Sequence, residues 1–228
     1  MKSLFAALCL SLGVNSVAAE ELPIFDAHVH YSHDAVKRTP PERIIELLKE
    51  AGVKKALVSS SDDNGTQLLY EAAPDLIVPA LRPYSRRGQI GTWMNNPASI
   101  DYMKGHLANN TYVAFGEFHA FGEDINTDVI QWMIQEAKER NMLLHHHGDA
   151  EAVHLIFKTW PEARVLWAHS GFDRPEDVAE VLSQYDRLWA DLAYRSDMMS
   201  RGDVDPEWRK VFMAYPCLLY TSPSPRDA

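Results

Sequence analysis

Cysteine is nearly absent from this sequence of 228 residues. The two cysteines lie near the ends: Cys9 belongs to an N-terminal apolar run, and Cys217 belongs to a short C-terminal segment of unusual composition. Residues 20–216 contain no cysteine. This part of the chain can therefore form no disulfide bond, and it offers no thiolate ligand to a metal ion.

An excess of positive charge is also missing. The 22 Lys and Arg residues are outnumbered by 32 Asp and Glu residues, which gives a formal net charge of −10. Such a chain repels a polyanion, so we expect a small-molecule substrate and no nucleic-acid partner, although a nuclease that neutralises its substrate with metal ions is not excluded. With 46% hydrophobic and 24% charged residues, the composition is that of an ordinary globular protein.

The most prominent apolar run, Leu4–Val14, is too short to cross a bilayer. It follows the positively charged Lys2 and precedes the small residues Val17–Ala19. This order of charge, apolar run and small residues is the pattern of a secretory signal peptide. We therefore expect cleavage after Ala19, export to the periplasm or secretion, and no stable membrane anchor.

Short apolar runs alternate with amphipathic helical stretches along the rest of the chain, which is typical of a mostly parallel sheet covered by helices. No glycine-rich phosphate loop follows the first strand, so the α/β pattern favours a (β/α)8 TIM-like barrel over a dinucleotide-binding sheet. The expected strands are Pro23–His28, Lys55–Ser60, Leu76–Leu81, Tyr112–Glu117, Met142–His147, Arg164–His169 and Leu188–Leu192. Helices are expected after a capping box that begins at Thr39, over Asp128–Arg140 behind Thr127, and over Asp149–Trp160, Pro175–Tyr185 and Pro206–Tyr215.

The C-terminal segment, residues 217–228, reads CLLYTSPSPRDA and has no periodicity. It resembles the translation of a sequencing-library adapter, so we expect a non-native tail. The chain then divides into a signal peptide (1–19), a barrel domain (20–216) and this tail. A complete barrel has eight strands in about 250 residues, so the barrel is expected to be a C-terminally truncated fragment that lacks strand eight.

Two histidines lie at the end of the first expected strand, in the segment FDAHVHY. Residues two apart in an extended strand share a face, so His28 and His30 point the same way. Active sites of such barrels lie at the C-terminal ends of the strands. Two imidazoles that converge there are typical ligands of a divalent transition metal.

Three more expected strands end in metal-ligating residue types. Strand four carries Glu117, strand five ends in three successive histidines, and strand six ends at His169. On strand five, alternation places His145 and His147 on one face and His146 on the other. We expect His147, the last of the three, to be the ligand and His145 to be the second choice.

The pattern of HxH on strand one, Glu on strand four and His on strands five and six resembles the amidohydrolase superfamily of metal-dependent barrels. The segments PIFDAHVH, AFGEFHAFG, HGDAEA and VLWAHSG are similar to its amidohydrolase-related branch, and the resemblance covers residues 23–216. It implies one or two divalent ions, zinc first, with manganese, iron or nickel as alternatives. It implies the metal ligands His28, His30, Glu117, His147 and His169, with Glu117 and His169 as the catalytic residues.

The family also uses an aspartate that ends strand eight and acts as general acid and base. This sequence has no such strand before its expected tail, and Asp227 within the tail is not assigned that role. The resemblance therefore implies a hydrolase that is inactive as this fragment.

Four residues are candidate substrate contacts. Arg82 follows strand three, and its planar guanidinium suits a substrate carboxylate, with a solvated surface arginine as the alternative. Asp191 on strand seven either lines the pocket or forms a helix cap or an internal ion pair. His145 and His119 complete this set.

The expected function is hydrolysis of a C–N or C–O bond, in an amide, ester or lactone, by metal-activated water. A metal-dependent decarboxylase of the same superfamily, a phosphoesterase and a non-catalytic metal-binding protein remain open alternatives. Nothing in the sequence indicates an oligomeric state.

Overall fold

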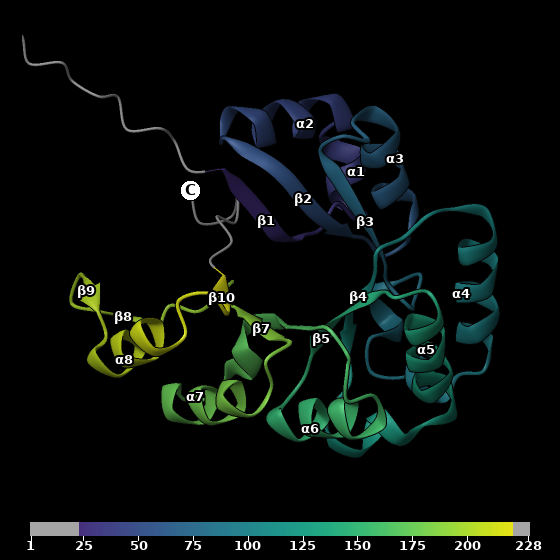
Figure 1. Cartoon of the computed structure of the whole chain (residues 1–228). Helices are drawn as coiled ribbons and strands as arrows, with labels where there is room; N and C mark the ends of the chain where they lie inside the picture. The colour runs from purple at the N-terminus through teal and green to yellow at the C-terminus, as the bar shows by residue number, and fades with distance from the viewer. Residues whose placement is uncertain (1–22, 221–228) are drawn as a thin grey trace, which may run out of the picture.

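The computed structural model describes residues 23–220. The expected signal peptide with its cleavage site, and residues 221–228 of the expected tail, lie outside the described residues. Parallel strands form one curved sheet that closes nearly into a ring, with the helices on its outside (Figure 1). The fold is an incomplete (β/α)8 barrel, as the sequence predicts.

The strands follow one another around the sheet in chain order. They are β1 (Ile24–Val29), β2 (Val53–Ser59), β3 (Ile77–Leu81), β4 (Ala114–His119), β5 (Leu143–His147), β6 (Val165–Trp167), β7 (Leu188–Asp191) and β10 (Leu219–Tyr220). A separate antiparallel pair consists of β8 (Met199–Ser200) and β9 (Asp203–Val204).

The helices are α1 (Asp34–Arg38), α2 (Pro41–Glu50), α3 (Asn64–Ala72), α4 (Ala98–Asn109), α5 (Asp128–Glu139), α6 (Ala150–Thr159), α7 (Pro175–Gln184) and α8 (Pro206–Ala214). Short 3-10 helices are η1 (Arg87–Gln89), η2 (Trp93–Asn95), η3 (Gly122–Asn126) and η4 (Ala168–Phe172). None of the helices within residues 23–220 combines the length and the apolar character needed to cross a bilayer.

All seven expected strands are present, with ends that differ by at most two residues from the prediction. An unexpected element occupies the eighth position: β10, which the sequence analysis placed in the tail, pairs in parallel with β7. It is only two residues long, and no pairing between β10 and β1 closes the ring among the described residues. The barrel is therefore incomplete at this edge.

The predicted capping box at Thr39 is wrong. Pro40 occupies the N-cap position of α2, no side chain caps this helix, and Thr39 instead ends α1. Thr127 does stand at the N-cap of α5, but its hydroxyl donates to the carbonyl oxygen of Asp124 rather than accepting from the helix. In α2, Pro41 at the first helical position has no N–H group to be capped, and its fixed φ suits the helix.

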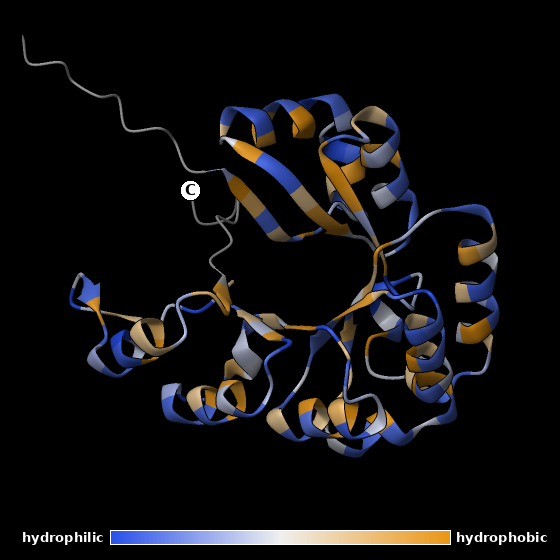
Figure 2. Ribbon diagram, viewed as in Figure 1, coloured by the Kyte–Doolittle hydropathy of each residue, from blue (hydrophilic) through white to orange (hydrophobic). Residues whose placement is uncertain are grey.

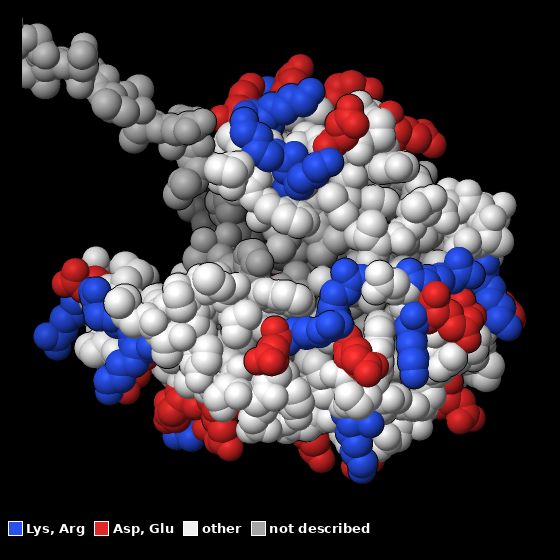
Figure 3. Space-filling model, in the orientation of Figure 1, with Lys and Arg blue, Asp and Glu red and all other residues white. Residues whose placement is uncertain are grey.

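Hydrophobic side chains cover both faces of the sheet. Inside the barrel, a small hydrophobic cluster is formed by side chains of β2, β3, β4 and β6. Outside, larger clusters fill the space between strands and helices, and Figure 2 shows mainly hydrophobic strands and helices that carry both kinds of residue. On the face drawn in Figure 3, Lys and Arg are interspersed with Asp and Glu. The inner cluster consists of Leu57, Ala80, Ala114 and Leu166.

Candidate metal centre

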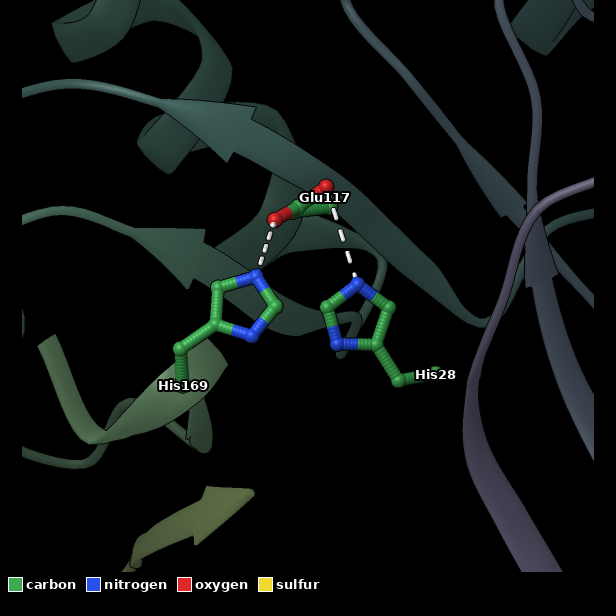
Figure 4. A group of neighbouring side chains, drawn as sticks. All are labelled: His28, Glu117 and His169. Carbon is green, nitrogen blue, oxygen red and sulfur yellow. Dashed lines mark ion pairs between the residues drawn. The ribbon is translucent and has the colours of Figure 1, made fainter. Parts of the chain in front are cut away.

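The side chain of Glu117 lies at the centre of a group of histidines at the C-terminal ends of the strands. Figure 4 shows the rings of His28 and His169 side by side, both pointing toward its carboxylate. The Nε2 atom of His28 is 3.6 Å from Oε2 of Glu117, and Nε2 of His169 is 3.3 Å from Oε1. Strands far apart in the sequence thus meet at one carboxylate.

Two further histidines complete this arrangement. The Nε2 atom of His30 is 3.0 Å from Oε2 of Glu117, and the Nδ1 atom of His147 is 2.6 Å from Oε1. The five residues that the sequence analysis named as metal ligands are therefore gathered around one point. Whether they bind a metal stays a prediction.

The outward-facing ring nitrogens are held by acceptors. His30 donates from Nδ1 to the carbonyl oxygen of Ser59 at 2.7 Å, and His169 donates from Nδ1 to the carbonyl oxygen of Ala193 at 2.7 Å. A carbonyl oxygen only accepts, so each Nδ1 carries a proton, and in the neutral ring the Nε2 atom presents a lone pair to the centre. Metal-ligating histidines are oriented in this way by their outer partners.

His28 has a charged outer partner. Its Nδ1 atom is 2.9 Å from Oδ2 of Asp191, while its Nε2 atom lies 3.1 Å from Nε2 of His30. Burial alone would lower the pKa of His28, but the carboxylates of Asp191 and Glu117 raise it to about 10. Without a metal, His28 therefore carries a proton on Nε2. This proton lies between the Nε2 atoms of His28 and His30, which would otherwise face each other with lone pairs. The imidazole and carboxylate set fits a divalent transition ion in that place.

Glu117 remains ionised despite its burial. Burial alone would raise its pKa, but the close contacts of its carboxylate with the surrounding imidazole rings, His147 and His169 first, hold the pKa well below its usual value. The residue before it must be glycine: Gly116 has a φ of +131°, and a Cβ atom there would lie 2.1 Å from the carbonyl oxygen of His145. This close approach of β4 to β5 sets Glu117 beside the histidines of β5.

Arg82 is buried, so the alternative of a solvated surface arginine is wrong. Its guanidinium forms an ion pair with Glu117, donates to the carbonyl oxygen of the same residue at 2.9 Å, and donates to Oγ of Ser61 at 3.0 Å. Its Nη2 atom is 3.4 Å from Nε2 of His30. Arg82 therefore belongs to the centre, and its contact with a substrate carboxylate stays a prediction.

Asp191 is fully buried at the end of β7. Besides the contact with His28, its Oδ1 atom accepts from the backbone N–H groups of His169 and Ala193, both at 3.0 Å. Burial would raise its pKa, but the neighbouring His28 and His145 hold the pKa well below its usual value. The sequence analysis left three roles open for Asp191, and the structure shows one of them, an internal ion pair with His28.

The histidines of β5 lie as alternation predicts. His145 is buried inside the barrel, with Nε2 3.6 Å from Oδ2 of Asp191, and burial lowers its pKa to about 4. His146 points to the other side and contacts the carbonyl oxygen of Ala120 through Nε2 at 2.9 Å. His147 is the member of the three that touches Glu117, which favours it over His145 as the ligand.

His119 lies at the rim of the centre and stacks on His147 with ring centroids 4.0 Å apart. The hydroxyl of Tyr84 is 2.8 Å from its Nδ1 atom, and burial lowers the pKa of His119 to about 3. His119 is therefore a neutral ring near the site, and its contact with substrate stays a prediction. Tyr84 was missed by the sequence analysis, although it lies two residues after Arg82.

The loop that carries His169 has an unusual backbone. Residues His169 to Phe172 all have positive φ values, between 50° and 64°. Arg195 holds this loop by donating to the carbonyl oxygens of His169 at 3.1 Å and Asp173 at 2.7 Å. Arg195 had no signal in the sequence, because its role depends on a loop 22 or more positions away.

Comparison with known proteins bears on the fold. The solved structure of a probable 2-pyrone-4,6-dicarboxylic acid hydrolase from Acinetobacter baumannii, with citric acid bound, is similar with a TM-score of 0.53 and 12% identity, over 88% of this chain and 83% of that chain. An aminofutalosine deaminase from Helicobacter pylori, in complex with methylthio-coformycin, gives a TM-score of 0.48 and 15% identity, over 80% of this chain and 51% of that chain. No family model and no curated protein matches this chain. The first likeness supports the (β/α)8 barrel fold.

Proposed function

We propose that this protein is a metal-dependent hydrolase that cleaves a C–N or C–O bond, in an amide, ester or lactone, of a small molecule. One observation carries the proposal: ring nitrogens of His28 and His30, at β1, and of His169, after β6, converge on the ionised Glu117 while their outer nitrogens are anchored by acceptors. The likeness in fold to a solved structure named as a hydrolase supports it.

The donor set decides which ions suit the centre. Imidazole nitrogen and carboxylate oxygen favour zinc, and they also accept manganese, iron or nickel. A bound ion of this kind polarises a substrate carbonyl and lowers the pKa of a water molecule. The residues that would hold one or two such ions are His28, His30, Glu117, His147 and His169.

Asp191 and Arg82 support the reaction from two sides. Asp191 accepts a hydrogen bond from Nδ1 of His28 and so keeps the Nε2 atom of that ring facing the centre. Arg82 places a positive charge next to Glu117 and His30, where negative charge develops on the substrate oxygen during hydrolysis. His119, a neutral ring in contact with the hydroxyl of Tyr84, lies where it can form a hydrogen bond to substrate.

The test is a hydrolysis panel on the full chain loaded with zinc. Esters, lactones, amides and phosphoesters are incubated with it, and carbon dioxide is measured in parallel. Turnover of at least one ester, lactone or amide, lost with a chelator and in Glu117→Gln and retained in the control Glu162→Gln, whose side chain is exposed, supports the proposal. The same result would contradict the expectation from the sequence that this chain is inactive.

Other outcomes of this panel contradict the proposal in distinct ways. Release of carbon dioxide without hydrolysis identifies a decarboxylase, and turnover of phosphoesters alone identifies a phosphoesterase. Stoichiometric zinc with no turnover on any compound supports a non-catalytic metal-binding protein.

A further inference from the structure

The edge of the centre on the side of His119 holds a second group of possible metal ligands. One ligand atom from each of Glu117, His119 and His147 lies within 4.8 Å of the other two. Ligand atoms around a tetrahedral zinc ion are roughly 3.4 Å apart, given Zn–N bonds of about 2.1 Å, so a small shift of these side chains closes the group around an ion. The ligands that the family resemblance implies do not include His119.

A second group meets the same distance limit: His28, Glu117 and His169. The two groups share Glu117 alone. Nδ1 of His147 lies 2.6 Å from Oε1 of this carboxylate, whereas Nε2 of His30 lies 3.0 Å from Oε2. One carboxylate can bridge two ions through its two oxygens, so the arrangement offers two separate positions. We call them the inner position (His28, His30, Glu117 and His169) and the outer position (Glu117, His119 and His147).

The two carboxylate oxygens of Glu117 differ in their partners. Oε2 forms the ion pair with Arg82, while the contacts described for Oε1 are with the imidazole rings of His147 and His169. Glu117 is buried, but His119 and His147 are partly exposed. A cation that enters from solvent past these two rings therefore meets Oε1, the oxygen that does not face the guanidinium.

His119 is held in place by three neighbours. Its ring stacks on that of His147 with centroids 4.0 Å apart, and Nε1 of Trp93 donates to its carbonyl oxygen at 2.8 Å. The hydroxyl of Tyr84 lies 2.8 Å from Nδ1 of His119 and 3.4 Å from the carbonyl oxygen of Glu117. A hydroxyl that donates to this carbonyl can accept a hydrogen bond from Nδ1, which leaves Nε2 of His119 free to bind an ion.

We propose that His119 is a metal ligand which, together with Glu117 and His147, binds a second divalent transition ion at the outer position. The inference rests on the function proposed above and adds where the second ion lies and which residue holds it. The outer position has three protein ligands and the inner position has four, so we expect zinc to fill the inner position first. Because Glu117 belongs to both positions, loss of the inner ion also weakens binding at the outer one.

The experiment measures how many zinc ions the full chain binds and how tightly. The chain is dialysed to equilibrium against rising concentrations of free zinc, and bound zinc is determined by elemental analysis. We expect the original protein to bind two zinc ions in two separate steps. We expect His119→Phe to bind one, with the affinity of the first step unchanged, because phenylalanine keeps a flat ring against His147 but has no nitrogen ligand.

Two further variants isolate the outer position. His106→Phe is the matched control: this histidine is also partly exposed and its ring packs on an aromatic neighbour, Tyr102, with centroids 4.5 Å apart, but it lies outside the centre. It is expected to bind two zinc ions. Tyr84→Phe removes the hydroxyl that contacts Nδ1 of His119, and we expect the second step to weaken about 10- to 100-fold while the first stays unchanged.

The outcomes separate this inference from the proposed function. One zinc ion in both the original protein and His119→Phe, or two in both, overturns the assignment of His119 and leaves the metal-dependent function standing. No zinc in the original protein contradicts the metal centre itself, and with it both proposals. If His119→Phe does not fold, Tyr84→Phe decides: an unchanged second step in that variant overturns the inference.

Discussion

Glu117 and Asp63 are both buried carboxylates, with exposed fractions of 3% and 0%, but their surroundings differ in kind. Asp63, at the N-terminus of α3, accepts hydrogen bonds on Oδ2 from the hydroxyl of Tyr112 at 2.5 Å and the side-chain amide of Gln67 at 2.9 Å. Glu117 faces imidazole rings from β1, β5 and the loop after β6. One histidine, His106, also lies near Asp63, with Nδ1 3.4 Å from Oδ2, whereas four histidines surround Glu117.

The comparison separates a structural polar contact from a metal-type centre. Oδ2 of Asp63 accepts from the hydroxyl of Tyr112 and the amide of Gln67, so the protein itself satisfies this atom. The inner nitrogens around Glu117 belong to rings whose outer nitrogens already donate to Ser59, Ala193 and Asp191. In a neutral ring the inner nitrogen then brings a lone pair to the carboxylate, and a bound cation would stabilise that arrangement in place of the proton that His28 carries.

Removing two of the converging rings should have the largest effect. We expect the double variant His28→Ala with His30→Ala to lose stoichiometric metal binding, because two nitrogen ligands disappear at once. Isothermal titration with zinc measures this on the full chain. The matched control is His33→Ala with His154→Ala, two histidines outside the centre. Retained stoichiometric zinc in the first double variant would sink the assignment of the centre.

The second prediction concerns the outer partner of His28. Asp191→Asn keeps an acceptor oxygen but removes the buried charge, and we expect the affinity for zinc to fall about 10- to 100-fold. The free energy of unfolding should also fall by about 3–5 kcal/mol, because the replacement leaves His28 without its ionic partner. An affinity equal to that of the original protein would show that Asp191 does not orient His28 for binding.

The third prediction uses His146, the histidine of β5 that points away from the centre. Burial lowers its pKa to about 4, whereas the unfolded chain takes up this proton near pH 6.5. The unfolded state therefore binds more protons between these values, and the free energy of unfolding falls as the pH falls from 6.5 toward 4. Between pH 7 and about pH 4.5 this group should contribute a loss of about 2–3 kcal/mol.

His146→Gln tests that pH dependence in urea denaturation of the metal-free chain. Glutamine keeps an N–H donor for the carbonyl oxygen of Ala120 but has no titrating group. We expect the variant to lose about 2–3 kcal/mol less than the original protein over the same pH interval. Identical pH profiles would contradict the buried neutral state of His146.

The smallest effect is expected in the structural polar contact. Tyr112→Phe removes the hydroxyl that donates to Asp63, and we expect a destabilisation of about 1–3 kcal/mol, since a buried charged acceptor loses a partner. Zinc affinity should stay unchanged, because this contact lies apart from the ligands around Glu117. A loss of zinc affinity in this variant would mean that the two buried carboxylates are not independent.

The sequence predicted the part of the centre that follows from strand periodicity. Alternation in β1 and β5 placed His28, His30 and His147 on the inner face, and the ends of β4 and β6 supplied Glu117 and His169. These predictions depend on residues within one strand and on a fold that aligns all strand ends. The short eighth strand was not expected, because its residues lie in a segment interpreted as a tail.

The parts that escaped prediction depend on contacts between distant segments. Tyr112 and Asp63 come from different connections of the barrel, and Arg195 reaches the loop of His169 only in the folded chain. Periodicity carries no information about these pairings, because loop conformation decides them.

The most direct test is elemental analysis of zinc in the full chain after dialysis, for the original protein, Glu117→Gln and Asp63→Asn. The account predicts one or two zinc ions per chain in the original protein and in Asp63→Asn, and a clear loss in Glu117→Gln. No zinc in the original protein, or an equal loss in both variants, would contradict the claim that Glu117 lies in a metal centre and Asp63 does not.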